Sequence, residues 1–239
     1  THPIFVGERS EEFFMRISGQ SYNEISQKGG GIFSTVKKLR LASDDELYDC
    51  SLKNITPFIY NGTTTIEAKS GYGLSTEDEI RSLEIIKKIN NSIPIDIIPT
   101  FLGAHAIPLE YKKEDYINLI CNEMIPEIAK RKLAVFCDVF CENGYFNIEQ
   151  SRKILETAKS FGLIPRVHAD EFKSFGASEL AAELGAASAD HLMVIKSDGM
   201  KALAKSGTVA TLLPGTTFFL NKGEYANGRR LIDNSCSVA

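Results

Sequence analysis

The sequence predicts an α/β fold of the (β/α)8 barrel type. Short apolar or β-branched runs alternate with longer stretches of helical period at intervals of roughly thirty residues. The apolar runs are continuous rather than alternating, as a parallel sheet buried on both faces requires. With 239 residues, 43% of them hydrophobic, the chain is long enough to bury the core of one large barrel domain.

The expected strands, in chain order, are residues 3–6, 63–68, 95–101, 134–140, 164–168, 187–189 and 208–213, with residues 237–239 opening an eighth. A closed barrel needs all eight strands to remove its sheet edges. We therefore expect a barrel that is incomplete at both ends, lacking the start of strand one and most of strand eight. The expected organisation is one barrel domain over residues 1–239, and a small flanking domain built from the missing ends would lie outside it.

Capping residues mark the helices between these strands. Ser43 stands three residues before Glu46, and Thr76 stands three before Glu79. Each pair has the spacing of a capping box, which satisfies free amide groups in the first helical turn. Pro57 is expected to kink or interrupt the helix that contains it, because its ring removes a backbone donor.

Composition and charge limit which partners and which cellular compartment are expected. The net charge is −4 and no basic cluster exceeds short pairs, which argues against nucleic acid. No apolar run is long enough to span a bilayer, so no membrane partner is expected. Five scattered cysteines fit a reducing compartment, and we expect a cytoplasmic protein. The expected partner is a small-molecule substrate, and a homodimer is compatible with the sequence.

Three of the four histidines, His105, His168 and His191, stand where predicted strands end. The fourth, His2, precedes the first apolar run. A single histidine at a strand end is more often structural than functional. Because the carboxyl ends of barrel strands form one face, histidines gathered there favour a shared site. Neutral imidazole is the usual nitrogen ligand of zinc and iron, so the pattern indicates a metal ion, either zinc or iron.

Three further polar residues are candidates, each with a structural alternative. Glu171, shortly after His168, is a candidate acid or base, or else an exposed loop carboxylate near Lys173. Tyr72, between two glycines, either offers a phenol to a polar substrate or packs over its loop. Arg9 either grips a substrate carboxylate or pairs with a neighbouring glutamate.

Eight stretches of the chain resemble imidazolonepropionase in the same order: residues 5–13, 29–32, 67–74, 100–105, 138–142, 168–171, 189–192 and 212–216. The resemblance covers essentially the whole chain. Its most specific block is Glu-Ala-Lys-Ser-Gly-Tyr-Gly at residues 67–73. The histidines alone would indicate only the wider amidohydrolase superfamily, whose members are metal-dependent barrels.

The resemblance implies hydrolysis of the cyclic amide 4-imidazolone-5-propanoate to N-formimidoyl-L-glutamate, a step of histidine degradation, by water activated on zinc or iron. It implies that His2 and His168 are metal ligands. The family's other histidine and aspartate ligands would lie before Thr1 and after Ala239. A polypeptide of residues 1–239 alone is therefore expected to be inactive.

The resemblance also assigns roles to the remaining candidates. The substrate-binding positions are Arg9, Tyr72, His105 and Glu171, and the catalytic positions are Glu171, as acid or base, and His191, which helps to activate water. Two alternatives stay open. One is a related amidohydrolase that deaminates a heterocycle, and the other is an inactive barrel that binds a small carboxylate.

Overall fold

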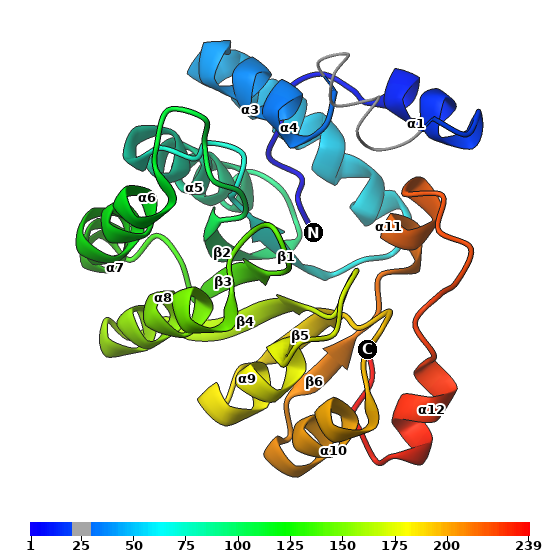
Figure 1. Cartoon of the computed structure of the whole chain (residues 1–239). Helices are drawn as coiled ribbons and strands as arrows, with labels where there is room; N and C mark the ends of the chain where they lie inside the picture. The colour runs from blue at the N-terminus through cyan, green and yellow to red at the C-terminus, as the bar shows by residue number, and fades with distance from the viewer. Residues whose placement is uncertain (21–29) are drawn as a thin grey trace. The chain divides into compact units, whose positions relative to one another are not determined.

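The structure is a computed structural model that describes residues 1–20 and 30–239. It divides into two compact units, Thr1–Phe136 and Cys137–Ala239, each of which alternates helices with strands (Figure 1). The first residue of the stretch 29–32 noted above lies outside the described residues. The expected single domain over residues 1–239 stays a prediction.

The described elements of the first unit are α1 (Ser10–Ile17), α3 (Ile32–Leu41), α4 (Asp44–Tyr60), β1 (Thr65–Lys69), α5 (Thr76–Asn90), β2 (Asp96–Ala104), α6 (Lys113–Leu119), the π-helix η1 (Ile120–Met124) and α7 (Ile125–Arg131). Strands β1 and β2 pair in parallel, with Thr65 opposite Asp96. Helix α5 connects them and packs against β2. Its residues Leu83, Ile86 and Ile89, part of the predicted apolar stripe, are fully buried.

The elements of the second unit are β3 (Phe136–Cys141, which begins at the boundary), α8 (Ile148–Ser160), β4 (Ile164–Ala169), α9 (Ala177–Leu184), β5 (Ser188–His191), α10 (Ser197–Ser206), β6 (Val209–Thr211), α11 (Pro214–Phe219) and α12 (Gly228–Asp233). Strands β4, β5 and β6 pair in parallel, with His168 opposite Asp190 and Asp190 opposite Thr211. Helices α8 and α9 pack against β4. This parallel pairing brings the carboxyl ends of neighbouring strands to one edge.

Six of the expected strands are confirmed, with ends that differ from the prediction by at most three residues. The expected strand at residues 3–6 is wrong, because that segment has no strand pairing. Thr1 bonds to β1: its ammonium group donates to the Glu67 carbonyl and its carbonyl accepts from the Lys69 amide. Beyond it, Pro3 has no amide proton to continue a ladder. The Asn54 side chain instead donates to the Pro3 carbonyl at 3.0 Å.

The two predicted capping boxes have different outcomes. Ser43 caps α4, since its hydroxyl accepts a hydrogen bond from the Glu46 amide at 3.2 Å. The cap predicted at Thr76 is wrong, because the N-cap of α5 is Ser75. The carboxylate of Glu79 is fully buried and bonds to the loop before the helix, so it is not the second half of a box.

Pro57 does not interrupt its helix, because α4 continues through it to Tyr60. It lies in the last turn, where one missing hydrogen bond leaves few later residues to disturb. The expected eighth strand at residues 237–239 is present as an isolated parallel bridge between Ala210 and Val238. Among the residues that the structure describes, no helix is long and apolar enough to cross a membrane.

Candidate functional site

Three candidate side chains of the first unit, His2, Tyr72 and His105, lie against one another, and we call them the ring group. Tyr72 lies in the loop after β1, and His105 directly follows β2. The imidazoles of His2 and His105 are stacked with centroids 4.9 Å apart, and the Tyr72 ring lies 5.3 Å from His105 and 5.8 Å from His2. His105 therefore stands at a strand end, as the sequence predicted, and His2 and Tyr72 lie against it.

Backbone contacts fix how the rings present their polar atoms. The Nδ1 atom of His105 lies 2.9 Å from the Gly71 carbonyl oxygen, which can only accept a hydrogen bond. Nδ1 is therefore the donor, and Nε2 is the acceptor of the neutral ring. Burial raises the pKa of Tyr72, and the positive charge of Arg9 opposes that rise. The phenol is consequently a neutral donor at physiological pH.

Arg9 stands at the N-cap of α1 and pairs with Glu12, one turn into that helix. Its Nε and Nη2 atoms donate to Glu12 Oε2 at 3.1 and 2.6 Å. The pairing with a neighbouring glutamate, one of the two interpretations of Arg9, is thus present. The pKa of Glu12 is lowered by its hydrogen bonds to Arg9 and Gly31, against the opposing effect of burial. Arg9 as a substrate ligand stays a prediction.

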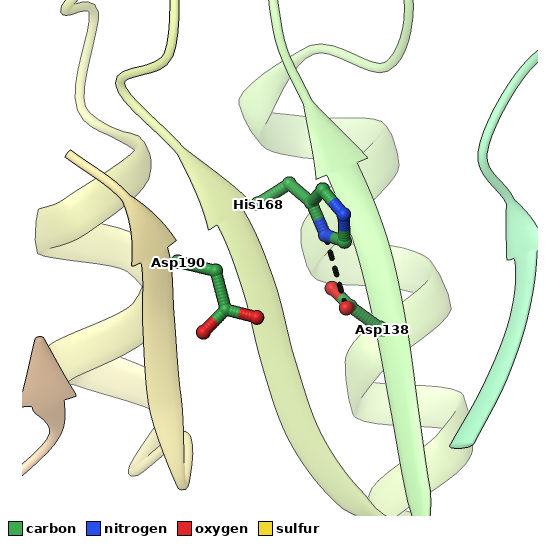
Figure 2. Close-up of side chains that lie close together, drawn as sticks. All are labelled: Asp138, His168 and Asp190. Carbon is green, nitrogen blue, oxygen red and sulfur yellow. Dashed lines mark ion pairs between the residues drawn. The ribbon is translucent and has the colours of Figure 1, made fainter. Parts of the chain in front are cut away.

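The second unit holds a buried charged group, which we define as Asp138, His168, Glu171, Asp190 and His191. All five side chains are buried, with 6% exposure at most. Strands β3, β4 and β5 contribute Asp138, His168 and Asp190 from adjacent positions, as Figure 2 shows. Their potential ligand atoms all lie within 4.8 Å of one another. Such a set of nitrogen and oxygen donors is suited to a metal ion.

The closest contact in this group joins His168 to Asp138. Nδ1 of His168 lies 3.0 Å from Oδ2 of Asp138 (Figure 2). The other carboxylate oxygen of Asp138 accepts from the amide of Val139 at 2.7 Å, which holds the side chain on its strand. A carboxylate beside Nδ1 favours a proton on that nitrogen and leaves the lone pair on Nε2. The arrangement allows Nε2 of His168 to offer its lone pair to a metal ion.

Asp190 has different neighbours, although it lies opposite His168 in the sheet. Its Oδ1 accepts a hydrogen bond from the Ser188 hydroxyl at 2.5 Å. The same oxygen lies 3.6 Å from Nη2 of Arg166, which supplies a positive charge. The negative charge of Asp190 is thus balanced by groups within β4 and β5, whereas the carboxylate of Asp138 faces the imidazole of His168.

Glu171 and His191 form the second contact of the charged group. Oε1 of Glu171 lies 3.5 Å from Nδ1 of His191. Glu171 is therefore not the exposed loop carboxylate of the alternative interpretation. Burial raises its pKa to about 7, with the Glu142 charge adding to the rise and His168 and Lys222 opposing it. A carboxyl group with that pKa can hold or release a proton near neutral pH.

The backbone around these side chains adopts unusual conformations. Asp170, His191 and Leu192 have φ angles of 51°, 80° and 58°, which residues with a Cβ atom rarely adopt. Glu142 stabilises one of these turns, because its carboxylate accepts from the amides of Phe172 and Lys173 at 2.8 and 3.2 Å. Strained backbone of this kind clusters at functional sites.

Sequence reasoning gave no role to Asp138, Asp190 or Glu142, and it gave Glu79 only a capping role; all four are buried here. The available signal was a carboxylate inside an otherwise apolar strand, as in Phe136–Cys141, where an unpaired charge would be costly. That signal identifies a residue that needs a partner, but it does not identify the partner.

The fold resembles solved barrels of the amidohydrolase superfamily. A 5-methylcytosine deaminase from Klebsiella pneumoniae matches with a TM-score of 0.65 and 14% identity, over 87% of this chain and 55% of that chain. An adenine deaminase from Arthrobacter aurescens matches with a TM-score of 0.66 and 12% identity, over 98% of this chain and 71% of that chain. No family model matches. These matches show an α/β barrel fold, which confirms the predicted fold class.

Within that class, the sequence matches one group of proteins. The chain is 50% identical over 241 aligned residues to the imidazolonepropionase of Brevibacillus brevis and 49% identical to that of Geobacillus thermodenitrificans. Each alignment covers 100% of this chain and 57% of the relative, so the chain spans little more than half the length of these relatives. The resemblance is confirmed, and the chain is a homologue of the imidazolonepropionases.

Proposed function

We propose that this chain supplies most of the active face of a metal-dependent hydrolase that converts 4-imidazolone-5-propanoate to N-formimidoyl-L-glutamate in histidine degradation. The observation that carries the proposal is the 50% identity, over the entire chain, to a protein named imidazolonepropionase. The ring group and the charged group support it, because they offer polar recognition and proton transfer, which opening a cyclic amide requires.

The first unit would bind the substrate. Tyr72 would donate a hydrogen bond to a polar atom of the imidazolone ring, since its phenol is neutral. His105 would accept one through Nε2, because its Nδ1 proton is already bonded to the Gly71 carbonyl. Arg9 would bind the propanoate carboxylate, because a guanidinium matches a carboxylate in two parallel hydrogen bonds. Glu12 keeps Arg9 oriented until the substrate arrives.

His2 and His168 would hold the metal ion, which we expect to be zinc or iron. The residues present fit such an ion, because Asp138 faces Nδ1 of His168 and leaves Nε2 for coordination. When bound, the ion would polarise the ring carbonyl and acidify a water molecule. Histidine and carboxylate donors suit both metals, so the donor set alone does not choose between them.

Glu171 and His191 would handle the protons of the reaction. Hydrolysis adds water across the carbon–nitrogen bond: the oxygen joins the carbonyl carbon, and the departing ring nitrogen gains a proton. Glu171, with a pKa of about 7, would accept a proton from the attacking water and deliver it to that nitrogen. His191, whose Nδ1 lies 3.5 Å from the Glu171 carboxylate, would help to orient and activate the water.

The remaining partners and the compartment are also proposals. We expect a small-molecule substrate rather than nucleic acid, given the net charge of −4. All five cysteines are free, and Cys121, Cys137, Cys141 and Cys236 are buried, which supports a reducing compartment such as the cytoplasm. Burial raises the pKa of Cys141 to about 12, so its thiol does not act as a nucleophile.

The test is turnover of 4-imidazolone-5-propanoate by the protein at its natural full length, with mass spectrometry of the product and metal analysis. We expect N-formimidoyl-glutamate to form. Arg9→Ala should lower kcat/KM by about 10- to 100-fold at unchanged metal content, from the loss of hydrogen bonds to a charged group. Glu12→Gln is the matched control, because it removes the ion-pair partner and keeps the guanidinium, and it should cost much less.

Two results would contradict the proposal. Release of ammonia from an aminated heterocycle, with no turnover of the imidazolone, would identify a deaminase. Absence of both activities and of stoichiometric metal would identify a barrel that only binds a carboxylate.

A further inference from the structure

Glu79 is a fully buried carboxylate that none of the steps above uses. It lies on α5, and its side chain reaches back into the loop between β1 and α5. Oε1 accepts hydrogen bonds from the amides of Gly73 and Leu74 at 2.9 and 2.8 Å, and Oε2 accepts from the amide of Gly71 at 3.0 Å. One side chain therefore holds the backbone on both sides of Tyr72.

The same loop is held from its other side by Arg40 of α3. Its Nε donates to the Gly73 carbonyl at 2.7 Å, and its Nη2 donates to the Leu74 carbonyl at 2.9 Å. Glu79 thus accepts hydrogen bonds from the amide groups of Gly73 and Leu74, and Arg40 donates to the carbonyl groups of the same residues. With both edges of the backbone bonded, the loop has little freedom to rotate its peptide planes.

Close packing adds to this restraint. Gly71 has a φ angle of 108°, and a Cβ atom built there would lie 2.9 Å from the Leu102 carbonyl oxygen. A Cβ atom built on Gly73 would lie 2.6 Å from the backbone of Asp78. Neither glycine has room for a side chain, so the loop lies directly against β2 and α5.

The held loop carries one member of the ring group and is bonded to a second. Tyr72 stands between Gly71 and Gly73, and His105 donates through Nδ1 to the Gly71 carbonyl. The amide of Gly71 bonds to Glu79. Any rotation of the backbone at Gly71 would therefore shift the phenol and alter the hydrogen bond that fixes the imidazole.

We propose that Glu79 is a positioning residue, which sets Tyr72 and His105 for substrate binding through the backbone of residues 71–74. The inference rests on the proposed function of those two side chains. It assigns no contact between Glu79 and the substrate. A carboxylate suits this task because its ionised oxygens only accept, and here they meet three backbone amides and the side chain of Ser70. A glutamine would turn an NH2 group toward one of those donors and lose the match.

The test compares Glu79→Gln with Glu77→Gln in the protein at full natural length. Glu77 lies on the exposed side of the same helix, two residues away, and serves as the control. We expect Glu79→Gln to lower kcat/KM for the imidazolone substrate by about 10- to 100-fold, as a small misplacement of binding groups does, at unchanged metal content. Most of the loss should fall on KM, because the proton-transfer groups are untouched.

A double-mutant cycle separates positioning from a general loss of stability. If Glu79 acts through Tyr72, then Glu79→Gln should cost much less in a Tyr72→Phe background than in the wild type. Additive losses in this cycle would overturn the inference, as would kcat/KM within twofold of wild type for Glu79→Gln.

Two further measurements do not depend on the substrate or on the folding of Glu79→Gln, respectively. Amide hydrogen exchange at Gly71, Gly73 and Leu74 should accelerate in Glu79→Gln but not in Glu77→Gln, even if the imidazolone is not the substrate. Unchanged exchange would overturn the inference independently of the proposed function. If Glu79→Gln does not fold, Arg40→Met loosens the same loop from outside, and it should give a smaller loss that is again weaker in the Tyr72→Phe background.

Discussion

The ring group of the first unit and the charged group of the second unit are fixed by different forces. Tyr72 and His105 are rings whose positions follow from a loop backbone packed against its neighbours. His168 and Glu171 are buried among other ionisable groups, and contacts between imidazole nitrogens and carboxylate oxygens orient them. Substitutions that change the size of a residue should therefore disturb the ring group most. Substitutions that remove a charge, and changes of pH, should disturb the charged group most.

This difference suits the proposed division of labour. Recognition of a flat, polar ring needs rigid surfaces, which a glycine-rich loop held at both edges provides. Proton transfer near neutral pH needs a carboxyl group with an altered pKa, which burial beside Glu142 provides at Glu171.

The largest effect is expected from Gly73→Ala, which tests whether shape fixes the ring group. The added methyl group would lie 2.6–2.7 Å from backbone and Cβ atoms of Asp78 and Glu79, which cannot move without shifting α5. We expect the free energy of unfolding to fall by about 3 kcal/mol, at the upper end of overpacking costs. Urea unfolding measures it. Gly215→Ala, where no atom lies within 4 Å, is the control and should be near neutral. Equal free energies of unfolding for the two variants would contradict this, because they would show that the loop adapts to the added methyl group at little cost.

The next effect is a pH dependence of stability that comes from Glu171. Its pKa is about 7 in the folded chain against a usual value of 4.5, so the folded state binds more protons between these pH values. Stability is therefore lost as pH rises from about 4.5 through 7, by about 2 to 3 kcal/mol. Glu171→Gln cannot ionise and should be spared this loss.

The measurement is urea unfolding of metal-free protein at pH 5 and pH 8. The stability of Glu171→Gln relative to wild type should increase between the two pH values. Glu224→Gln, at an exposed position of the same unit, controls for removing one carboxylate and should show no such change. A relative stability of Glu171→Gln that does not depend on pH would show that Glu171 ionises in the fold as freely as in water.

Much of the fold was predictable because its signals are local. Apolar runs located six strands, and the hydroxyl of Ser43 capped its helix as the spacing indicated. The failed strand at residues 3–6 had the composition of a strand, but Pro3 cannot donate and the carbonyls nearby bond to Asn54. The composition of a segment indicates which secondary structure it favours, but strand pairing depends on the backbone groups that lie beside it.

The site was predictable only in part, for a related reason. Histidines at strand ends can be read from the sequence, because strand ends can. The carboxylates that orient them cannot, since Asp138 is 30 positions from His168 and Glu79 acts on a loop that precedes its own helix. The Thr76–Glu79 spacing looked like a capping box because a capping glutamate and a glutamate that binds the preceding loop both stand in the first turn of a helix.

The smallest expected effect concerns the two aspartates of the charged group, and it tests which of them serves His168. Asp138→Asn should weaken metal binding by about 10- to 100-fold, the usual cost of removing the carboxylate behind a metal-binding histidine. The amide keeps the size of the side chain but removes the charge that favours a proton on Nδ1 of His168. Titration of metal-free protein with zinc measures the affinity without reference to catalysis.

Asp190→Asn is the matched control, because it changes another buried carboxylate of the same group. Its Oδ1 faces Arg166 and accepts from Ser188, so its loss should disturb those groups and leave zinc affinity within a fewfold of wild type. If both variants lost zinc to the same degree, Asp190 would be acting on the metal as well. The charged group would then be a single three-residue ligand set rather than one histidine with its supporting carboxylate. The contrast between the aspartates therefore decides whether charge in this unit orients a ligand or binds the ion directly.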